Sequence, residues 1–178
     1  MSLQERLVER KRLGFISVKV LEELITPSSV QQLLSQDASV PVHQVDQDYV
    51  VKALPRARKL IAVLVLTGLE QHILEIISER RMTDDIFPID NWWTFPSLAA
   101  EDAKCVYSEQ WTIPPVLKRG KHLQFPEGVI LPFLSKRCVS YGSFGIVYRV
   151  EIADGHLDSQ VLGSAKVRTV SRASVSLI

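Results

Sequence analysis

Apolar residues along this chain follow two different periods. Up to about residue 90 they recur with the spacing of one helix face, and after about residue 145 they alternate with polar residues as in a strand. From Ser2 to Lys11 the residues are mostly strong helix formers, and Gly14 follows where a helix would end. The pattern predicts a helical region that begins with a short amphipathic helix and a sheet that comes later in the chain.

Two more short helices are predicted by their start signals. Thr26 is a favourable N-cap and Pro27 suits the first helical position, so a helix should cover about residues 27–36. A polar loop that contains proline follows. Asp46 or Asp48 should then cap a third short helix, which the next proline interrupts.

The most apolar stretch, residues 60–66, predicts a central buried helix. We expect this helix to run from Ala57 to Arg81, with the shorter helices packed around it. A membrane span needs about 18 or more uninterrupted apolar residues, and the polar residues from Glu70 onward end the run well short of that. The acidic pair Asp84-Asp85 follows in a turn. Neighbouring carboxylates in a turn are usually solvated, so no catalytic role is expected for this pair.

Residues 91–133 contain many prolines and aromatic residues, which predicts a connector. We expect its aromatic side chains to pack onto the helical part or onto the sheet, because aromatic residues supply a large buried area in a small domain. A platform that stacks nucleic-acid bases is the alternative, but basic residues are few in this segment. The aromatic residues in and beside it are Trp92, Trp93, Phe95, Trp111, Phe125 and Phe133.

A glycine-rich turn leads into an alternating strand after Gly145. Tyr148, Val150 and Ile152 should lie on one face of that strand, and Val147, Arg149 and Glu151 on the other. The glycines should therefore close a strand-turn-strand hairpin. A dinucleotide-binding fingerprint places its glycines before a helix, whereas the flap over ATP in protein kinases joins two antiparallel strands. The sequence favours the second arrangement.

The kinase flap has the pattern G-x-G-x-x-G-x-V. Gly142, Gly145 and Val147 occupy its second, third and valine positions, while Ser140 stands at the first glycine position. Backbone without a Cβ lets amide N–H groups approach phosphate oxygens, and the valine covers the base. The candidate nucleotide contacts in this loop are Gly142, Ser143, Phe144, Gly145 and Val147. The alternative is a hairpin in which glycine serves the turn geometry alone.

Short motifs lead up to this loop and continue past it. They are Gln110-Trp111, Pro114-Pro115, His122-Leu123, Leu131-Pro132-Phe133, the run from Gly142 to Val150, and the segment from Ile152 to His156. In this order and spacing they resemble the serine/threonine protein-kinase-like proteins abundant in filamentous fungi. The resemblance covers most of the chain.

This resemblance implies an α+β fold in three parts. A helical N-terminal region at residues 1–90 and the connector at 91–133 would precede an incomplete protein-kinase N-lobe at 134–178. That lobe would hold the glycine-rich loop and the first three strands of a small antiparallel sheet. The resemblance also implies that Lys166 pairs the α and β phosphates of ATP. A solvated lysine is the alternative at that position.

Two hypotheses about function come from different classes. A protein kinase needs an H-R-D catalytic loop and a D-F-G aspartate that holds magnesium, and neither occurs among the 178 residues. The first hypothesis is a truncated kinase-like chain that binds ATP weakly, would hold magnesium only with a large lobe present, and is inactive alone. The second is a non-catalytic helical module that binds a protein partner and carries a vestigial kinase-derived tail.

Composition narrows the choice of partner and compartment. The net charge is +1, which gives no long-range attraction to nucleic acid or to an anionic membrane. Cys105 and Cys138 lack CxxC spacing, and the four histidines lack ligand spacing, so neither a disulfide framework nor a metal site is expected. The N-terminus lacks the apolar core of a secretory signal. We expect a cytoplasmic or nuclear protein that is not secreted.

Overall fold

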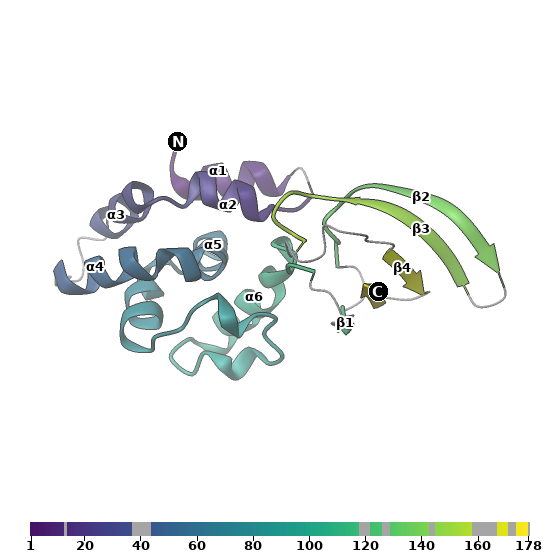
Figure 1. Cartoon of the computed structure of the whole chain (residues 1–178). Coiled ribbons are helices and arrows are strands. Elements are labelled where there is room, and N and C mark those ends of the chain that lie inside the picture. The colour runs from purple at the N-terminus through teal and green to yellow at the C-terminus, as the bar shows by residue number, and fades with distance from the viewer. Residues whose placement is uncertain are drawn as a thin grey trace. The chain divides into compact units, whose positions relative to one another are not determined.

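The chain folds as two compact units, Met1–Ile113 and Pro114–Ile178. The computed structural model describes residues 1–12, 14–36, 44–117, 122–125, 129–142, 145–157, 167–170 and 174–177. Within these ranges the first unit is helical and the second carries the strands (Figure 1). The predicted α+β fold with an N-terminal helical region is confirmed. The boundary between the units lies inside the segment 91–133, which was predicted to be a connector.

Six α-helices build the described part of the first unit. They are α1 (Leu3–Lys11), α2 (Val18–Leu24), α3 (Pro27–Gln36), α4 (Gln44–Ala53), α5 (Arg58–Leu66) and α6 (Ala100–Glu109). Shorter helical turns of 3-10 type cover Leu54–Arg56, Glu70–His72, Asp84–Ile86, Trp92–Thr94 and Gln110–Thr112, and a π-helical turn covers Leu74–Glu79. The sequence pattern did not predict α2 or α6.

Local capping signals explain why α1 and α3 begin where the sequence predicts. The Ser2 hydroxyl accepts the Glu5 N–H at 3.1 Å, and the Glu5 carboxylate accepts the Ser2 N–H at 2.6 Å, which together form a capping box. At α3, the Thr26 hydroxyl accepts the Ser29 N–H at 3.2 Å. The third helix differs from the prediction. Because α4 includes residues from Gln44 onward, Asp46 and Asp48 lie within it and do not cap it.

The predicted helix from Ala57 to Arg81 ends at Leu66, because the chain closes α5 with a Schellman motif. Gly68 has φ of 73°, its N–H donates to the Val65 carbonyl at 3.2 Å, and the Leu69 N–H donates to the Leu64 carbonyl at 2.8 Å. The Val65 and Leu64 carbonyls thus accept N–H groups of the turn, and the regular bonding of the α-helix ends here. The prediction of one long helix was therefore wrong beyond residue 66, since the glycine supplies the left-handed turn.

α5 is the buried centre of the first unit, as predicted. Its residues from Leu60 to Val65 have no exposed surface, and α1, α2 and α6 all pack against it (Figure 1). Burial of one such leucine or isoleucine side chain contributes about 1.5–3 kcal/mol. The apolar face of these helices is thus the main source of stability in this unit.

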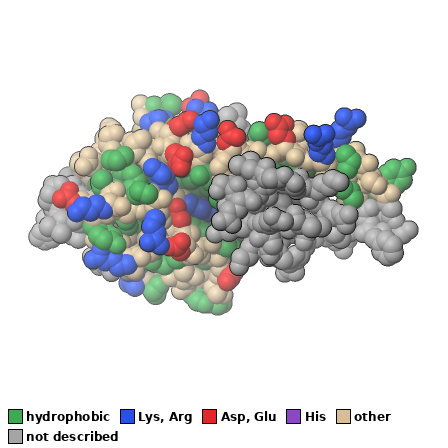
Figure 2. Space-filling view, viewed as in Figure 1, with side chains coloured by type: hydrophobic (Ala, Val, Ile, Leu, Met, Phe, Trp, Pro, Cys, Tyr) green, Lys and Arg blue, Asp and Glu red, His purple; other side chains and the backbone are tan. Residues whose placement is uncertain are grey.

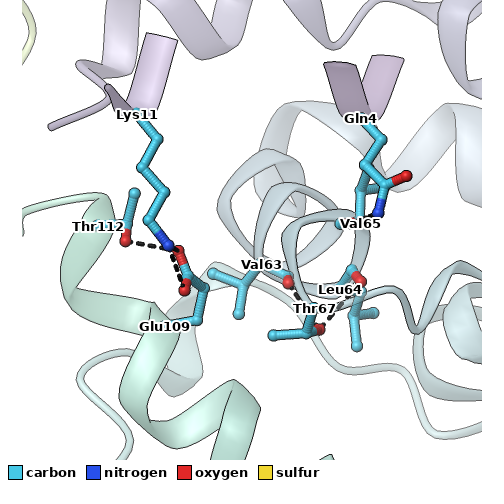
Figure 3. A network of polar contacts seen from close by, with 8 residues as sticks. All are labelled: Gln4, Lys11, Val63, Leu64, Val65, Thr67, Glu109 and Thr112. Carbon is cyan, nitrogen blue, oxygen red and sulfur yellow. Dashed lines mark hydrogen bonds and ion pairs between the residues drawn. The ribbon is translucent and has the colours of Figure 1, made fainter. Parts of the chain in front are cut away.

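Polar contacts join α1 to the elements around it (Figure 3). The Gln4 amide donates to the Val65 carbonyl at 3.3 Å, near the end of α5. Lys11 pairs with Glu109 of α6 at 2.7 Å, and the Thr112 hydroxyl donates to the same carboxylate at 2.6 Å (Figure 3). Such exposed ion pairs contribute little stability each, so they orient helices that apolar packing already holds.

The aromatic residues before α6 pack into the first unit. Phe95 is buried in its core, and Trp92 is partly buried against the same core. The prediction that aromatic side chains of this segment pack onto the helical part is confirmed for these two residues. The segment nevertheless contains α6, whose first turn carries Glu101 and Asp102 as a helix dipole favours.

The described strands of the second unit form two sheets. β2 (Phe133–Gly142) pairs antiparallel with β3 (Gly145–Ile152). β1 (His122–Gln124), β4 (Val167–Val170) and β5 (Ser174–Leu177) form a separate antiparallel sheet in the order β1-β5-β4. We predicted one sheet of about three strands over residues 134–170. The structure differs because β4 pairs with β5 and not with the hairpin.

Contacts of His156 join two segments of the second unit. Its side chain is fully buried, with ring Nδ1 3.3 Å from the Pro115 carbonyl oxygen. Its own carbonyl accepts the Leu117 N–H at 2.7 Å. His156 therefore joins the end of the hairpin segment to the first residues of this unit. Among the described residues, no helix of either unit is long and apolar enough to cross a membrane.

Candidate functional site

The glycine loop closes an antiparallel hairpin, as predicted. Gly142 lies opposite Gly145 at the last pair of the two strands. A strand, not a helix, follows Gly145, which is the context of a kinase-type flap and not of a dinucleotide-binding fingerprint. The predicted site residues Ser143, Phe144 and Lys166 lie outside the described residues.

Val147 shares one face of the hairpin with polar side chains. It lies opposite Ser140, and along the same face Arg149 lies opposite Arg137. Next on this face, the Ser135 hydroxyl bonds the Glu151 carboxylate at 3.2 Å. Apart from the partly buried Val147, these residues are exposed. The face that would cover a nucleotide base is therefore open to solvent and bears two arginines.

The opposite face of the hairpin is more apolar. It pairs Tyr141 with Ile146, Cys138 with Tyr148, Lys136 with Val150 and Phe133 with Ile152. The Lys136 ammonium lies 3.9 Å from the centroid of the Tyr148 ring, a cation–π contact between neighbouring strands. Phe133, Tyr148, Val150 and Ile152 are half-buried. More side chains are partly buried on this face than on the Val147 face.

The hairpin has some of the groups that a nucleotide flap needs. The structure brings Gly142, Gly145 and Val147 together, so glycine backbone and an apolar cover lie within one turn of the hairpin. The strand after Lys166 is β4, which pairs with β5. The hydrogen-bonded ladder of the hairpin does not include β4, although β4 lies alongside β3. The kinase resemblance implied a third strand in the same sheet as the flap.

A second polar cluster surrounds the N-terminus of α5. Ala57 precedes this helix and has no capping side chain, and Asp84 supplies the cap from another element. Its two carboxylate oxygens accept the N–H groups of Lys59 at 3.0 Å and of Leu60 at 2.9 Å. The expectation that both carboxylates of the acidic pair are solvated was wrong for Asp84. Asp85 is exposed and forms an ion pair with Arg56.

Lys59 is enclosed by the same cluster. Its ammonium donates to the Ile113 carbonyl at 2.6 Å and lies 4.5 Å from the centroid of the Phe87 ring. Burial lowers the pKa of Lys59 from 10.5 to about 8, although the Asp84 carboxylate partly opposes this shift. Burial also raises the pKa of Asp84, while the N–H groups of Leu60 and Lys59 pull it down. The cluster anchors a helix end and the last residue of the first unit.

The sequence contained one signal for this cluster. Arg56, Arg58 and Lys59 lie at the start of a helix, where the helix dipole disfavours positive charge. Basic residues in that position need an anion close by, and Asp84 and Asp85 supply two carboxylates. The sequence alone did not show that this pair folds back onto α5, because 24 residues separate Asp84 from Leu60.

Lys59 should make the stability of the first unit depend on alkaline pH. Between pH 8 and 10.5 the unfolded chain holds a proton on this lysine that the folded chain has released. The free energy of unfolding should therefore rise with pH in this window, by about 2–3 kcal/mol relative to a Lys59→Met variant. Urea unfolding followed by tryptophan fluorescence at several pH values measures the difference, because all three tryptophans lie in this unit.

The matched control for this titration is Lys52→Met, which removes an exposed lysine of α4. The control should keep the rise of stability with pH that the wild type shows. If Lys59→Met and Lys52→Met give parallel pH profiles, the enclosure of the Lys59 ammonium is incorrect.

The described part of the chain contains no candidate metal site. There, no three His, Cys, Asp or Glu side chains lie together as a metal site requires. Cys105 and Cys138 are free and exposed. On the face of the first unit seen in Figure 2, acidic and basic side chains are interspersed and form no large patch of one sign.

Comparison with known proteins gives no further assignment: no family model, no curated protein and no solved structure matches this chain significantly.

Proposed function

We propose that this chain is a protein-kinase-like protein whose glycine hairpin contacts nucleotide weakly and which transfers no phosphate by itself. The observation that carries the proposal is the hairpin closed by Gly142 and Gly145, with Val147 beside it on an open face. Glycine backbone near phosphate and a valine over the base are the two contacts that a flap makes with ATP.

The open face limits the affinity. A small-molecule site usually buries most of its ligand between two walls, and the neighbours of Val147 on its face are exposed. A flap that covers one side of the nucleotide should bind no more tightly than about 1 mM, which corresponds to about 4 kcal/mol. ATP is the proposed ligand, and Lys166 is the residue proposed to pair with its phosphates.

Catalysis needs groups that this sequence does not contain. Among the 178 residues there is no H-R-D loop and no D-F-G aspartate, and no acidic residue follows Asp158 that could pair with Lys166 from downstream. Magnesium would need carboxylates from a large lobe. We therefore propose that these 178 residues transfer no phosphate by themselves.

Titration of the full chain with magnesium ATP, followed by amide chemical shifts, tests the nucleotide contact. Shifts should centre on Gly142, Gly145 and Val147, with a Kd no tighter than about 1 mM. Gly145→Val should abolish them, because a Cβ and a branched side chain would stand where the phosphates approach. Tyr148→Phe, on the opposite face of the same strand, is the control and should leave them unchanged.

Two outcomes of this titration would contradict the proposed nucleotide contact. Unchanged hairpin shifts at about 10 mM ATP would remove the nucleotide contact. A micromolar Kd that Gly145→Val abolishes would show a complete nucleotide site in place of a weak one.

In the same preparation, phosphate incorporation into a generic protein substrate should be undetectable. Robust incorporation that survives Lys166→Met would show that another group carries the chemistry.

A second candidate function is a protein-binding role for the helical unit, and one exposed aromatic residue favours it. The Trp93 side chain is 60% exposed although its neighbour Trp92 packs against the core. The two rings meet edge to face at 5.5 Å, and the Lys104 ammonium lies 5.7 Å from the Trp92 ring centroid. Exposed tryptophans are common anchors of protein interfaces, so this residue is the place to test partner binding.

A further inference from the structure

The outer strand of the hairpin exposes an unusual number of large apolar side chains. Every residue of β2 from Leu134 to Tyr141 is exposed. Leu134 is 62% exposed, Val139 56% and Tyr141 84%, and Ile146 on β3 adds 41%. Side chains of this kind in one short segment mark an interaction surface more often than a solvated strand.

One edge of β2 is also free to pair. In the described part of the second unit β2 bonds only β3, and β3 in turn lies alongside β4. A strand with an open edge presents N–H and C=O groups that an extended segment can pair with. The edge of β2 is therefore suited to strand addition.

The regular part of this edge carries positive charge on both faces. The pairing of β2 with β3 is irregular between Phe133 and Ser135 and between Cys138 and Ser140, which leaves residues 135–138 as a regular stretch. Lys136 and Arg137 lie in this stretch, and consecutive strand residues point to opposite faces. Arg137 also lies opposite Arg149, so two like charges face each other with no carboxylate bonded to either among the described residues.

A second copy of this chain fits that edge poorly. Antiparallel pairing of two β2 strands centred on Lys136 would place Lys136 opposite Lys136, and centring on Arg137 would place Arg137 opposite Arg137. Centring between them would place Lys136 opposite Arg137. Like charges directly opposite are destabilising, and lysine on an edge is a device that discourages self-pairing. The edge of β2 therefore disfavours pairing with β2 of a second copy and favours a segment that carries negative charge.

We propose that the open edge of β2 binds an extended acidic segment of a protein partner by strand addition. Two consecutive acidic residues of the partner lie opposite Lys136 and Arg137, one on each face of the sheet. Apolar partner residues on either side contact the exposed Leu134 and Tyr141 side chains. The main-chain bonds supply affinity, and the paired charges select the partner and fix its register. This interaction uses residues other than Gly142, Gly145 and Val147, although Arg137 lies on the same face of the hairpin as Val147.

The probe for this site is a capped ten-residue peptide of alternating valine and threonine with two glutamates at its centre. A second peptide with two lysines in place of the glutamates is its control. Titrated into the full chain at low salt, the acidic peptide should shift the amides of residues 135–138 and bind at least about tenfold more tightly than the basic peptide. Raising the salt to about 0.3 M should weaken that binding several-fold, because the charges are exposed.

Charge reversal provides the matched variants. Lys136→Glu combined with Arg137→Glu should exchange the preference, so that the basic peptide binds more tightly. Arg10→Glu combined with Arg12→Glu makes the same change of net charge on exposed residues of the first unit and should leave the preference as in the wild type.

Three results would overturn the proposal. They are equal binding of both peptides, shifts that avoid β2, and a stable dimer of the free chain whose formation Lys136→Glu with Arg137→Glu alters. If the reversed variant loses the hairpin, its amide spectrum will show this directly. The peptide comparison and the salt dependence on the wild type still decide the question in that case.

Discussion

Replacement of Gln110 by leucine should lower the free energy of unfolding of the first unit by about 3–5 kcal/mol. The Gln110 side chain is fully buried. Its amide bonds the backbone N–H and carbonyl of Ile89, as a neighbouring strand would. Its oxygen accepts the Ile89 N–H at 2.7 Å, and its nitrogen donates to the Ile89 carbonyl at 3.1 Å and to the Tyr107 carbonyl at 2.8 Å. Leucine fills a similar volume but leaves these three backbone groups without partners.

Denaturant unfolding followed by tryptophan fluorescence measures this loss. Gln32→Leu is the control, since Gln32 is an exposed glutamine of α3, and it should change the free energy of unfolding by less than about 0.5 kcal/mol. A loss of under about 1 kcal/mol for Gln110→Leu would mean that the Ile89 groups find other partners.

Removal of the Asp84 carboxylate should have a comparable effect, of about 3–4 kcal/mol for Asp84→Ala. Two N–H groups at the start of α5 would lose their acceptor, and the enclosed Lys59 ammonium would lose the carboxylate that offsets its burial. Asp84→Asn keeps an acceptor oxygen but not the charge, so it should lose less than the alanine variant does. The same unfolding measurement applies at neutral pH.

Asp85→Ala is the matched control for this experiment. Its carboxylate is exposed and pairs with the exposed Arg56, so its loss should cost less than about 1 kcal/mol. Equal losses for Asp84→Ala and Asp85→Ala would contradict the assignment of Asp84 as the cap of α5.

The elements that the sequence predicted well are those whose signals are local. The helix formers from Ser2 to Lys11 and the start signal of Thr26 with Pro27 lie within or next to the helices they predict, so α1 and α3 were predicted closely. The hairpin was predicted for the same reason, because glycine spacing and strand alternation occur within one short segment. Gly68, inside the predicted helix of residues 57–81, is also a local signal. An isolated glycine inside a helical pattern does not by itself show that the helix ends there.

What the sequence did not predict depends on distant partners. The cap of α5 comes from Asp84, which is distant in sequence. β4 pairs with β5 and not with the hairpin, and the alternation of apolar residues does not show which strands will pair. Of the candidate site, the sequence predicted the hairpin and the position of Val147. It did not predict that the Val147 face would be open, because that depends on which face packs toward the rest of its unit.

The contacts that join α1 to the end of the first unit also affect how this unit folds during synthesis. The Ile16 N–H donates to the Thr112 carbonyl at 2.9 Å, and Lys11 and Glu109 are 98 residues apart in sequence. Contacts of such high sequence separation raise the contact order of a helical protein and slow its folding, since a long loop must close first. On the ribosome, the first helix cannot complete these contacts until Thr112 has left the exit tunnel. Until then α1 can pack only against elements that have already emerged, such as α5.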